Sequence, residues 1–178
     1  MHAAAGGVGL LLTQIVGLRG GRVIGTTSTE EKAREATDAG ADEVIGYDGF
    51  ADRARELTDG RGVAVVYDGV GAATFDESLS ALRTRGHMVL YGAASGAVAP
   101  VDPVRLQGGG SLYLTRPSLQ HYTTTRDELL EHAHAVLGWI ASGDLDVRIG
   151  GRYGLEDARR AQEDLQGRRT TGKLVLDV

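Results

Sequence analysis

The chain opens with Met1-His2-Ala3-Ala4-Ala5-Gly6-Gly7-Val8-Gly9-Leu10-Leu11-Leu12, a stretch rich in alanine, glycine and leucine. From Ala4 onward it has the spacing of G-x-G-x-x-G, with alanine at the first glycine position. Such a loop turns the backbone from a strand into a helix whose free N–H groups face a diphosphate. Gly6 permits close approach of the diphosphate, and Gly9 permits tight helix packing. An ordinary Ala- and Gly-rich helix start has the same spacing, so the following segments must decide between the two interpretations.

Length, net charge and cysteine content narrow the class of protein. A chain of 178 residues is long enough for one domain, or for one domain with an appendage. With 24 acidic and 19 basic side chains the net charge is −5, which argues against a broad nucleic-acid interface. No cysteine is present, so neither a disulfide framework nor a thiolate metal site is expected, and the cytoplasm is the predicted location. No signal peptide is apparent, and the apolar run Val8–Leu12 is far shorter than the ~20 residues of a membrane span, so no membrane association is expected.

Short apolar strands alternate with helices through the first half of the chain. Glycines at the helix ends and β-branched runs mark the boundaries. They predict helices from the loop to Leu18, from Thr29 to Gly40, over 50–57 and over 73–82, and strands over 22–26, 43–45, 63–67 and 86–91. The strand 63–67 is almost wholly apolar, so it should be buried on both faces. This alternation predicts right-handed βαβ crossovers and a parallel sheet.

The pattern changes after Gly92. A short irregular link begins at 101–104, and the remaining elements are predicted as strands at 110–115, 147–149 and 173–176 and helices at 126–142 and 155–165. The predicted fold class is α/β, a Rossmann-type doubly wound parallel sheet followed by a C-terminal α+β segment.

The second strand indicates which nucleotide would bind. NAD-binding modules usually place Asp or Glu at its end, where the carboxylate holds the ribose hydroxyls. Here the strand runs into Gly25-Thr26-Thr27-Ser28-Thr29, with Lys32 soon after and no carboxylate. Hydroxyls and an ammonium suit a 2′-phosphate, so NADPH is favoured. The alternative is that Ser28 or Thr29 caps a helix and Lys32 is a solvated charge.

Several segments together resemble the NADPH:quinone oxidoreductases, the zinc-free, zeta-crystallin-like branch of the medium-chain dehydrogenase/reductases. They are Ala4–Gly9, Gly25–Thr26 with Lys32, Tyr67-Asp68-Gly69-Val70-Gly71, and Thr115-Arg116-Pro117-Ser118-Leu119 with Tyr122 and Thr124–Arg126. The resemblance covers essentially the whole chain. It implies hydride or electron transfer from NADPH to a quinone or a similar electrophilic acceptor. Two alternatives stay open: a catalytically silent, crystallin-like NADPH-binding protein, and a fragment of an enoyl-thioester reductase.

The resemblance also implies a set of cofactor contacts. Diphosphate contacts fall at Ala5, Gly6, Gly7 and Val8, and 2′-phosphate contacts at Lys32 and Tyr47, with Ser28 beside them. Gly69, Val70 and Gly71 would lie along the cofactor, Tyr91, Gly92 and Ser95 near its nicotinamide half, and Arg168 would reach back to the phosphates. The alternatives are ordinary packing for the two tyrosines and a surface charge for Arg168.

Family members begin with a mostly β catalytic domain that this sequence lacks. The resemblance therefore implies an NADPH-binding domain over 1–116 with a shortened first strand, and over 117–178 a returning segment of the missing domain. An engineered truncation, a misplaced start codon or a natural fragment would each explain the short beginning, and residues 1–4 are predicted to pair as a stub of the central strand. Family members also pair through the strand equivalent to Gly110–Thr115, so a homodimer is expected.

No catalytic residue can be assigned from the sequence. Hydride transfer from NADPH requires neither a metal nor an activated nucleophile, and no metal site is expected. His132 and His134 are two apart on a predicted helix, so they face different sides and are better explained as surface positions. Asp68 and His87 could form a dyad, but no G-x-S-x-G elbow accompanies them. Asp68 is instead predicted to end a strand and to order the loop at Gly69–Gly71.

Overall fold

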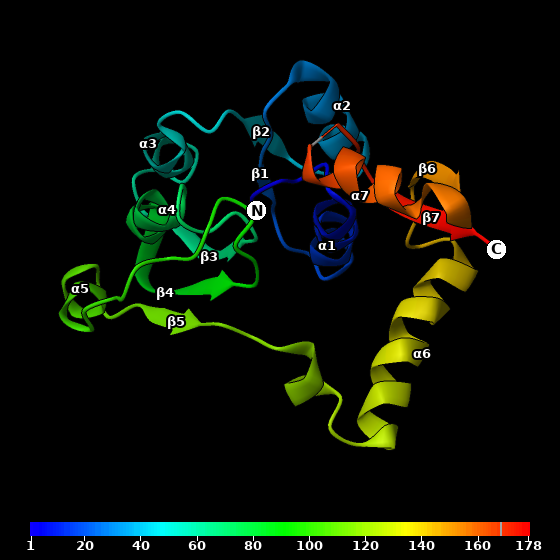
Figure 1. Cartoon of the computed structure of the whole chain (residues 1–178). Helices are drawn as coiled ribbons and strands as arrows, with labels where there is room; N and C mark the ends of the chain where they lie inside the picture. Colours follow the sequence, from blue (N-terminus) through cyan, green and yellow to red (C-terminus); the bar gives the residue numbers. More distant parts are fainter. Residues whose placement is uncertain (168) are drawn as a thin grey trace. The chain divides into compact units, whose positions relative to one another are not determined.

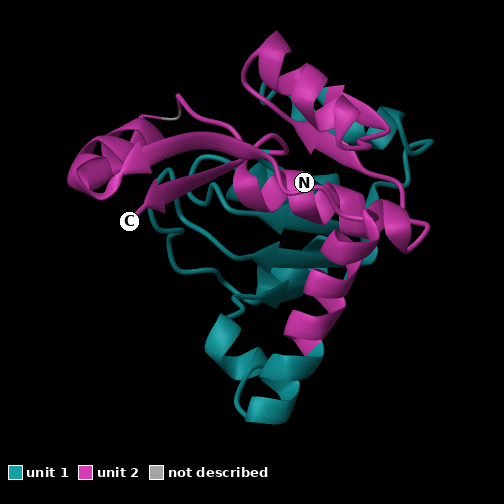
Figure 2. Ribbon diagram, turned by 90° about the vertical axis from the view of Figure 1, so that its right-hand side faces the viewer, with its two compact units in different colours: residues 1–3, 45–131 teal, residues 4–44, 132–178 magenta. Residues whose placement is uncertain are grey.

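A computed structural model describes residues 1–167 and 169–178 of the chain. It divides into two compact units, coloured separately in Figure 2. Unit 1 comprises Met1–Ala3 and Ile45–Glu131, and unit 2 comprises Ala4–Val44 and His132–Val178. This division differs from the predicted boundary between 116 and 117, which refers to a longer fold and stays a prediction.

Unit 1 contains a three-stranded parallel sheet (Figure 1). Its strands are β3 (Val63–Asp68), β4 (Leu82–Leu90) and β5 (Tyr113–Thr115), with β4 in the middle. Met88 is the register partner of Val66 on one side and of Leu114 on the other. The connections contain α4 (Phe75–Ala81) after β3 and α5 (Val104–Gly108) after β4. Parallel strands require such crossovers, so the predicted βαβ architecture is confirmed.

Helices α3 (Phe50–Glu56) and α4 pack together in unit 1. Gly49 precedes α3 with φ of 64°, a left-handed conformation that favours glycine. The Arg55 guanidinium donates to the carbonyl oxygens of Ser80 and Leu82 at 2.8 and 3.0 Å, which ties α3 to the end of α4. The core beside these helices is apolar and includes Phe50, Phe75, Leu79, Leu82 and Met88.

Some predictions of burial and of element bounds in unit 1 are wrong. Ala64 is exposed, so β3 is not buried on both faces. The predicted irregular link continues into helix α5, because Pro103 has helical dihedrals and stands just before the first turn. β4 begins at Leu82 rather than at Gly86. A short 3-10 helix, η1 (Leu119–Tyr122), was not predicted, since four residues carry no periodicity.

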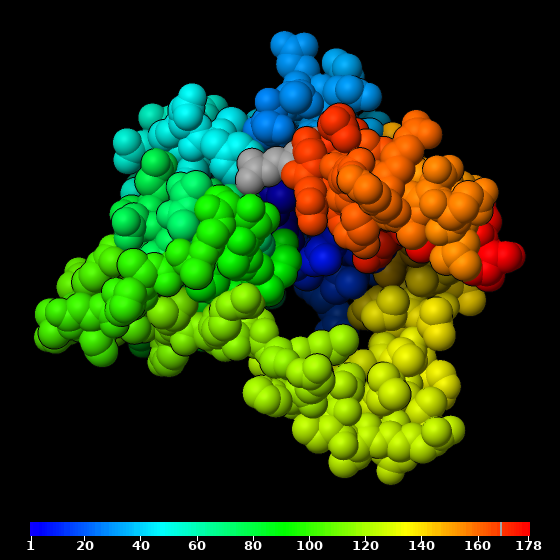
Figure 3. All heavy atoms as spheres, in the orientation of Figure 1, coloured from blue at the N-terminus to red at the C-terminus, as the bar shows by residue number. Residues whose placement is uncertain are grey.

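Unit 2 joins the first elements of the chain to its last ones. They are α1 (Gly7–Leu18), β1 (Ile24–Thr26), α2 (Glu30–Asp38), most of β2 (Glu43–Ile45), the second part of α6 (Arg126–Ser142), β6 (Ile149–Gly154), η2 (Leu155–Asp157), α7 (Ala158–Gln166) and β7 (Lys173–Asp177). β1 pairs with β2, and β6 pairs with β7 in parallel. α7 buries only Ala161 among its side chains and contributes to the outer surface of the unit (Figure 3). The final helix and strand agree with the predicted ones within three residues, and residues 155–157 form η2 instead of the start of the helix.

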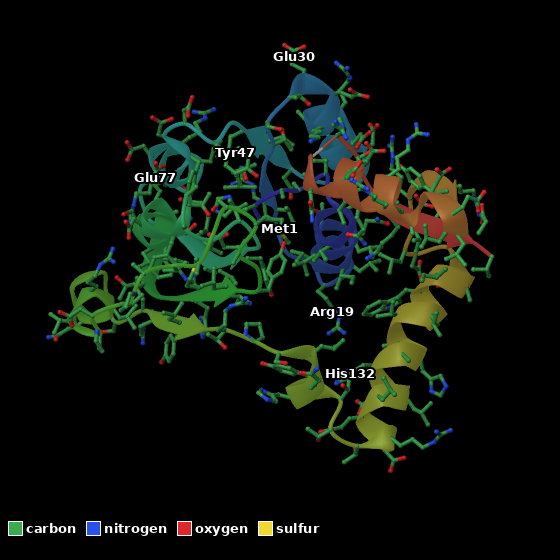
Figure 4. The ribbon with its side chains drawn as sticks, in the orientation of Figure 1. Met1, Arg19, Glu30, Tyr47, Glu77 and His132 are labelled. Carbon is green, nitrogen blue, oxygen red and sulfur yellow. The ribbon has the colours of Figure 1, made fainter. Side chains whose placement is uncertain are left out.

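Two contacts from α1 hold the ends of unit 2 together. The Gln14 side-chain amide donates to the Asp146 carbonyl oxygen at 3.0 Å, and its oxygen accepts from the Asp146 N–H at 2.8 Å. Arg19 extends from the end of α1 (Figure 4), and its guanidinium lies 5.5 Å from the centre of the Trp139 ring, a cation–π distance. The C-terminal elements are therefore bonded to the first helix of the chain.

The first residues pair as a strand stub. In unit 1 the His2 N–H donates to the Tyr67 carbonyl oxygen of β3 at 3.0 Å. In unit 2 the Ala4 N–H donates to the Thr26 carbonyl oxygen of β1 at 3.1 Å. The prediction that residues 1–4 still form strand-like hydrogen bonds is confirmed. Among the described helices, none is long and apolar enough to span a membrane.

Candidate nucleotide-binding site

In unit 2 the glycine loop ends at the N-terminus of α1. Gly6 is extended, with φ of −75° and ψ of 165°, and the first helical bond runs from the Leu10 N–H to the Gly6 carbonyl oxygen. No side chain of the described residues caps this end, and the first turn contains no acid. Backbone N–H groups of a first turn have no acceptor inside the helix, and the helix dipole favours an anion there. This end of α1 has the properties of a diphosphate site.

The C-terminal segment lies against the same loop. The Gly172 N–H donates to the Ala5 carbonyl oxygen at 3.3 Å, and Gly6 forms a parallel bridge with Gly172. A Cβ atom at Gly7 would come within 2.8 Å of the Gly172 carbonyl oxygen. Position 7 therefore requires glycine because two chain segments cross there. The predicted contact of Gly7 with a diphosphate is a separate expectation.

The segment after β1 presents hydroxyl groups before α2. Thr29 is the N-cap of α2, and its side-chain oxygen accepts the Lys32 N–H at 3.2 Å. Thr26 and Thr27 are buried, whereas Ser28 is exposed and is not the capping residue. The capping alternative thus holds for Thr29 alone. Ser28 and the half-buried Lys32 stay candidates for a phosphate contact.

In unit 1 the carboxylate of Asp68 organises the Gly69–Gly71 turn. Asp68 is fully buried at the end of β3. Its Oδ1 atom accepts the N–H groups of Val70 and Gly71 at 2.7 and 3.0 Å. Its Oδ2 atom accepts the hydroxyls of Thr74 and Ser78 at 2.7 and 3.1 Å. The prediction that Asp68 orders this turn is confirmed, and His87 takes no part, because it stacks on Tyr113.

His2 extends this buried network. Its Nε2 atom lies 2.9 Å from the Ser78 hydroxyl. Because Ser78 gives its one proton to Asp68, His2 acts as the donor, which requires a proton on Nε2. Burial lowers the pKa of His2 to about 4, and the charge of the N-terminal amine acts in the same direction, so the ring is neutral near pH 7.

Tyr91 follows β4 and packs against the glycine turn. A Cβ atom at Gly69 would come within 2.8 Å of the Tyr91 ring and hydroxyl. Burial raises the pKa of Tyr91 to about 12, and the charges of Asp68 and Tyr47 add to the effect. A Cβ atom at Gly92 would overlap the Gly69 carbonyl oxygen, so these two glycines mark a close crossing of two loops.

Ser95 and Tyr47 are engaged with the backbone of unit 1. The Ser95 hydroxyl donates to the Val70 carbonyl oxygen at 2.7 Å and accepts the Ala73 N–H at 3.0 Å. The hydroxyl of Tyr47, which is labelled in Figure 4, accepts the Ala3 N–H at 3.0 Å, and the Tyr47 and His2 rings stack with their centres 5.9 Å apart. Tyr47 is therefore packed and bonded within unit 1, one acceptor position of its hydroxyl is used, and its contact with a 2′-phosphate stays a prediction.

Arg168 lies outside the described residues. Its neighbour Arg169 donates twice to Asp164 Oδ1, at 3.1 and 2.7 Å, and this pairing, with the hydroxyl of Tyr153, lowers the pKa of Asp164. His132 and His134 are exposed on α6, as predicted, and His132 is labelled in Figure 4.

Sequence reasoning missed three contributors to these regions: His2, Ser78 and Glu35. Their partners lie far away along the chain, 76 residues from His2 to Ser78 and 113 from Glu35 to Arg148. Ser78 and Glu35 lie on helices and His2 precedes the glycine loop, and no local pattern marks any of them, so only the three-dimensional structure reveals their partners.

These features define a Rossmann-type dinucleotide-binding fold, with a glycine loop, an uncapped helix and parallel strands. The chain belongs to the zinc-binding dehydrogenase family, whose model matches residues 7–137. It is 49% identical to a quinone oxidoreductase of Salmonella typhimurium, over 98% of this chain and 55% of the relative. It is 41% identical to a 2-haloacrylate reductase of a Burkholderia species, over 99% of this chain and 54% of the relative.

A solved structure shares the fold closely. A mycobacterial protein in complex with NADPH superimposes with a TM-score of 0.96 at 55% identity, over 98% of this chain and 55% of the other. The chain therefore spans about half the length of the relatives that it matches.

The family description mentions zinc, and the residues here do not fit a zinc site. The sequence contains no cysteine, and within residues 1–167 and 169–178 no three His, Asp or Glu side chains gather as metal ligands. Zinc is held by three or four such donors in tetrahedral geometry.

Proposed function

We propose that this chain binds NADPH and forms the NADPH-binding part of a quinone oxidoreductase. The observation that carries the proposal is the uncapped N-terminus of α1 behind a glycine loop, with no acid in its first turn. A diphosphate is the anion that such an end accepts. The absence of a carboxylate between Gly25 and Thr29 and the presence of Lys32 favour a 2′-phosphate over a free ribose hydroxyl.

The proposed contacts keep to the residues given by the family resemblance. Ala5, Gly6, Gly7 and Val8 bind the diphosphate, while Ser28, Lys32 and Tyr47 bind the 2′-phosphate. Gly69, Val70, Gly71, Tyr91, Gly92, Ser95 and Arg168 complete the cofactor contacts. The Asp68 carboxylate supports this set by fixing the turn at 69–71.

NADPH supplies a hydride when it is bound, so the chain's own task is to bind and orient the cofactor. A quinone is the proposed acceptor, and similar electrophilic alkenes belong to the same proposal, since one relative is a 2-haloacrylate reductase. Catalytic residues stay unassigned. The alternative, a catalytically silent NADPH-binding protein, predicts binding without quinone-dependent oxidation of NADPH.

The proposal is tested by titrating the purified chain with NADPH and NADH while following ligand fluorescence. The expected result is a preference for NADPH of roughly tenfold or more, since a charge-assisted contact to the extra phosphate contributes about 1.5–3 kcal/mol. Lys32→Ala should reduce this preference. The matched control is Arg34→Ala, which removes an exposed cation two residues further along α2. Equal binding of both nucleotides, or no binding of either, would overturn the proposal.

A homodimer through the edge of the unit 1 sheet is part of the proposal. β5 is the edge strand in the order β3-β4-β5, and Tyr113 on it is 56% exposed. An edge strand offers unpaired backbone groups to a second copy. A sedimentation mass of one chain at micromolar concentration would contradict the homodimer.

The cytoplasm is the proposed location, in keeping with a sequence that has no cysteine.

A further inference from the structure

Glu35 is a buried carboxylate in the middle of α2. Its side chain is 8% exposed, and its Oε1 atom accepts from the Arg148 guanidinium at 2.7 Å and from the Thr171 hydroxyl at 3.2 Å. Its Oε2 atom is buried and has no hydrogen-bond donor among the described residues. A carboxylate is costly to bury, and both of its partners come from the last part of the chain.

The two partners of Glu35 stand where β6 and β7 begin to pair. The Lys173 N–H donates to the Arg148 carbonyl oxygen at 2.8 Å. A Cβ atom at Gly150 would overlap the Thr171 carbonyl oxygen, so the two segments are in close contact. Gly172 has φ of 64°, which turns the chain between Thr171 and β7. Glu35 therefore holds both sides of this crossing at once.

The crossing of these two segments also lies directly beside the glycine loop. Gly172 follows Thr171 directly, bonds to the Ala5 carbonyl oxygen and bridges Gly6. Its own carbonyl oxygen lies where a side chain at Gly7 would be. A shift of Thr171 would carry Gly172 with it and would alter the loop that leads into α1.

We infer that Glu35 is a positioning residue for the diphosphate end of the nucleotide site. It acts through Thr171 and Gly172, and the ion pair with Arg148 keeps the carboxylate oriented. The inference rests on the proposed NADPH binding. It adds a residue on α2 that does not touch the cofactor and that sets the backbone around the loop at 5–7.

The test compares Thr171→Val with Thr171→Ser in the full chain. Valine removes the hydroxyl donor at nearly constant shape, whereas serine keeps it. The probes are NADPH and adenosine 2′-monophosphate, which carries the 2′-phosphate and lacks the diphosphate. Thr171→Val should raise the Kd for NADPH about fivefold, as one lost hydrogen bond predicts, and should leave the Kd for adenosine 2′-monophosphate unchanged. Thr171→Ser should restore the NADPH affinity.

Glu35→Gln is the second variant, and it tests the inference independently if Thr171→Val does not fold. Glutamine keeps an acceptor oxygen and removes the charge that holds Arg148, so the NADPH affinity should fall in the same selective way. Glu31→Gln, at an exposed position of α2, is the control. A lowered Tm with an unchanged Kd for NADPH, or equal loss for both probes, would overturn the inference and leave the proposed function standing. Failure of the unmodified chain to bind NADPH would overturn both.

Discussion

The methyl group of Ala4 occupies the space that a side chain at position 25 would need. Ala4 is completely buried, and a Cβ atom at Gly25 would lie 2.8 Å from the Ala4 Cβ atom. Ala4 stands where the glycine-loop pattern has its first glycine, and its N–H donates to Thr26 in the neighbouring strand. Glycine at position 25 thus accommodates alanine at position 4. The room for the Ala4 methyl group thus comes from the missing side chain at Gly25 in β1.

Gly25→Ala should destabilise the chain by about 1–3 kcal/mol, the usual cost of inserting a methyl group into a packed region. Adding Ala4→Gly should recover most of that loss, since the two side chains compete for one space. Gly17→Ala is the control, because nothing lies within 4 Å of its Cβ position and alanine favours a helix. Urea denaturation of the unmodified chain, Gly25→Ala, Ala4→Gly, the double variant and the control measures the effect. Simple additivity of the two substitutions would contradict the shared space.

Asp68→Asn should lower the free energy of unfolding by about 2 kcal/mol. The carboxylate accepts from two backbone N–H groups and two hydroxyls, and an amide cannot accept with its nitrogen. Glu77→Gln, at an exposed position of α4 (Figure 4), should change stability by less than about 0.5 kcal/mol. Equal midpoints in urea for the two variants would show that the buried network contributes nothing.

Acidification should destabilise the chain through His2. The folded pKa of His2 is lowered to about 4 from 6.5, so between these values the unfolded chain takes up the proton and the folded one does not. The contribution of His2 to the free energy of unfolding is fully present above pH 6.5. It is lost as the pH falls toward 4, and the loss is roughly 3 kcal/mol.

Other groups titrate over the same range, so the comparison is made with His2→Gln. This variant should show a shallower loss of stability between pH 6.5 and pH 4 than the unmodified chain. His121→Gln changes an exposed histidine and should leave the dependence intact. Parallel curves for the unmodified chain and His2→Gln would mean that His2 is not buried in its neutral form.

Gln14→Met should cost about 1 kcal/mol, because it removes both bonds to the backbone of Asp146 while keeping the length of the side chain. Gln162→Met, on the exposed face of α7, is the matched control. Hydrogen exchange at the Asp146 amide reports the contact directly. Protection of that amide in the variant equal to that in the unmodified chain would refute the proposed link between α1 and the C-terminal elements.

Much of the architecture could be predicted because it depends on local patterns. Helix α6 and strand β2 have the predicted bounds, since a long apolar stripe and a short β-branched run need no distant partner. The exposure of Ala64 could not be predicted, because an apolar run does not tell which of its faces is covered. The beginning of β4 at Leu82 depends on pairing with Val63, a contact between segments.

The candidate site could be predicted in outline. The glycine loop and the absence of an acid after β1 are visible in the sequence, and so is the role of Asp68 before three small residues. The supporting partners could not be found in the same way. Thr171 lies 136 residues from Glu35, and no periodicity connects positions that meet only after the chain has folded back.

The composition of unit 2 has a consequence for the order of events during synthesis. Residues 45–131 belong to unit 1, so they emerge from the ribosome between the two parts of unit 2. Contacts as distant as Gln14 with Asp146 cannot form until residue 146 has left the ribosome. Contacts of such large sequence separation also form slowly, because closing the intervening loop costs entropy first. The glycine loop therefore lacks its backbone contacts with Gly172 until more than 160 further residues have been synthesised.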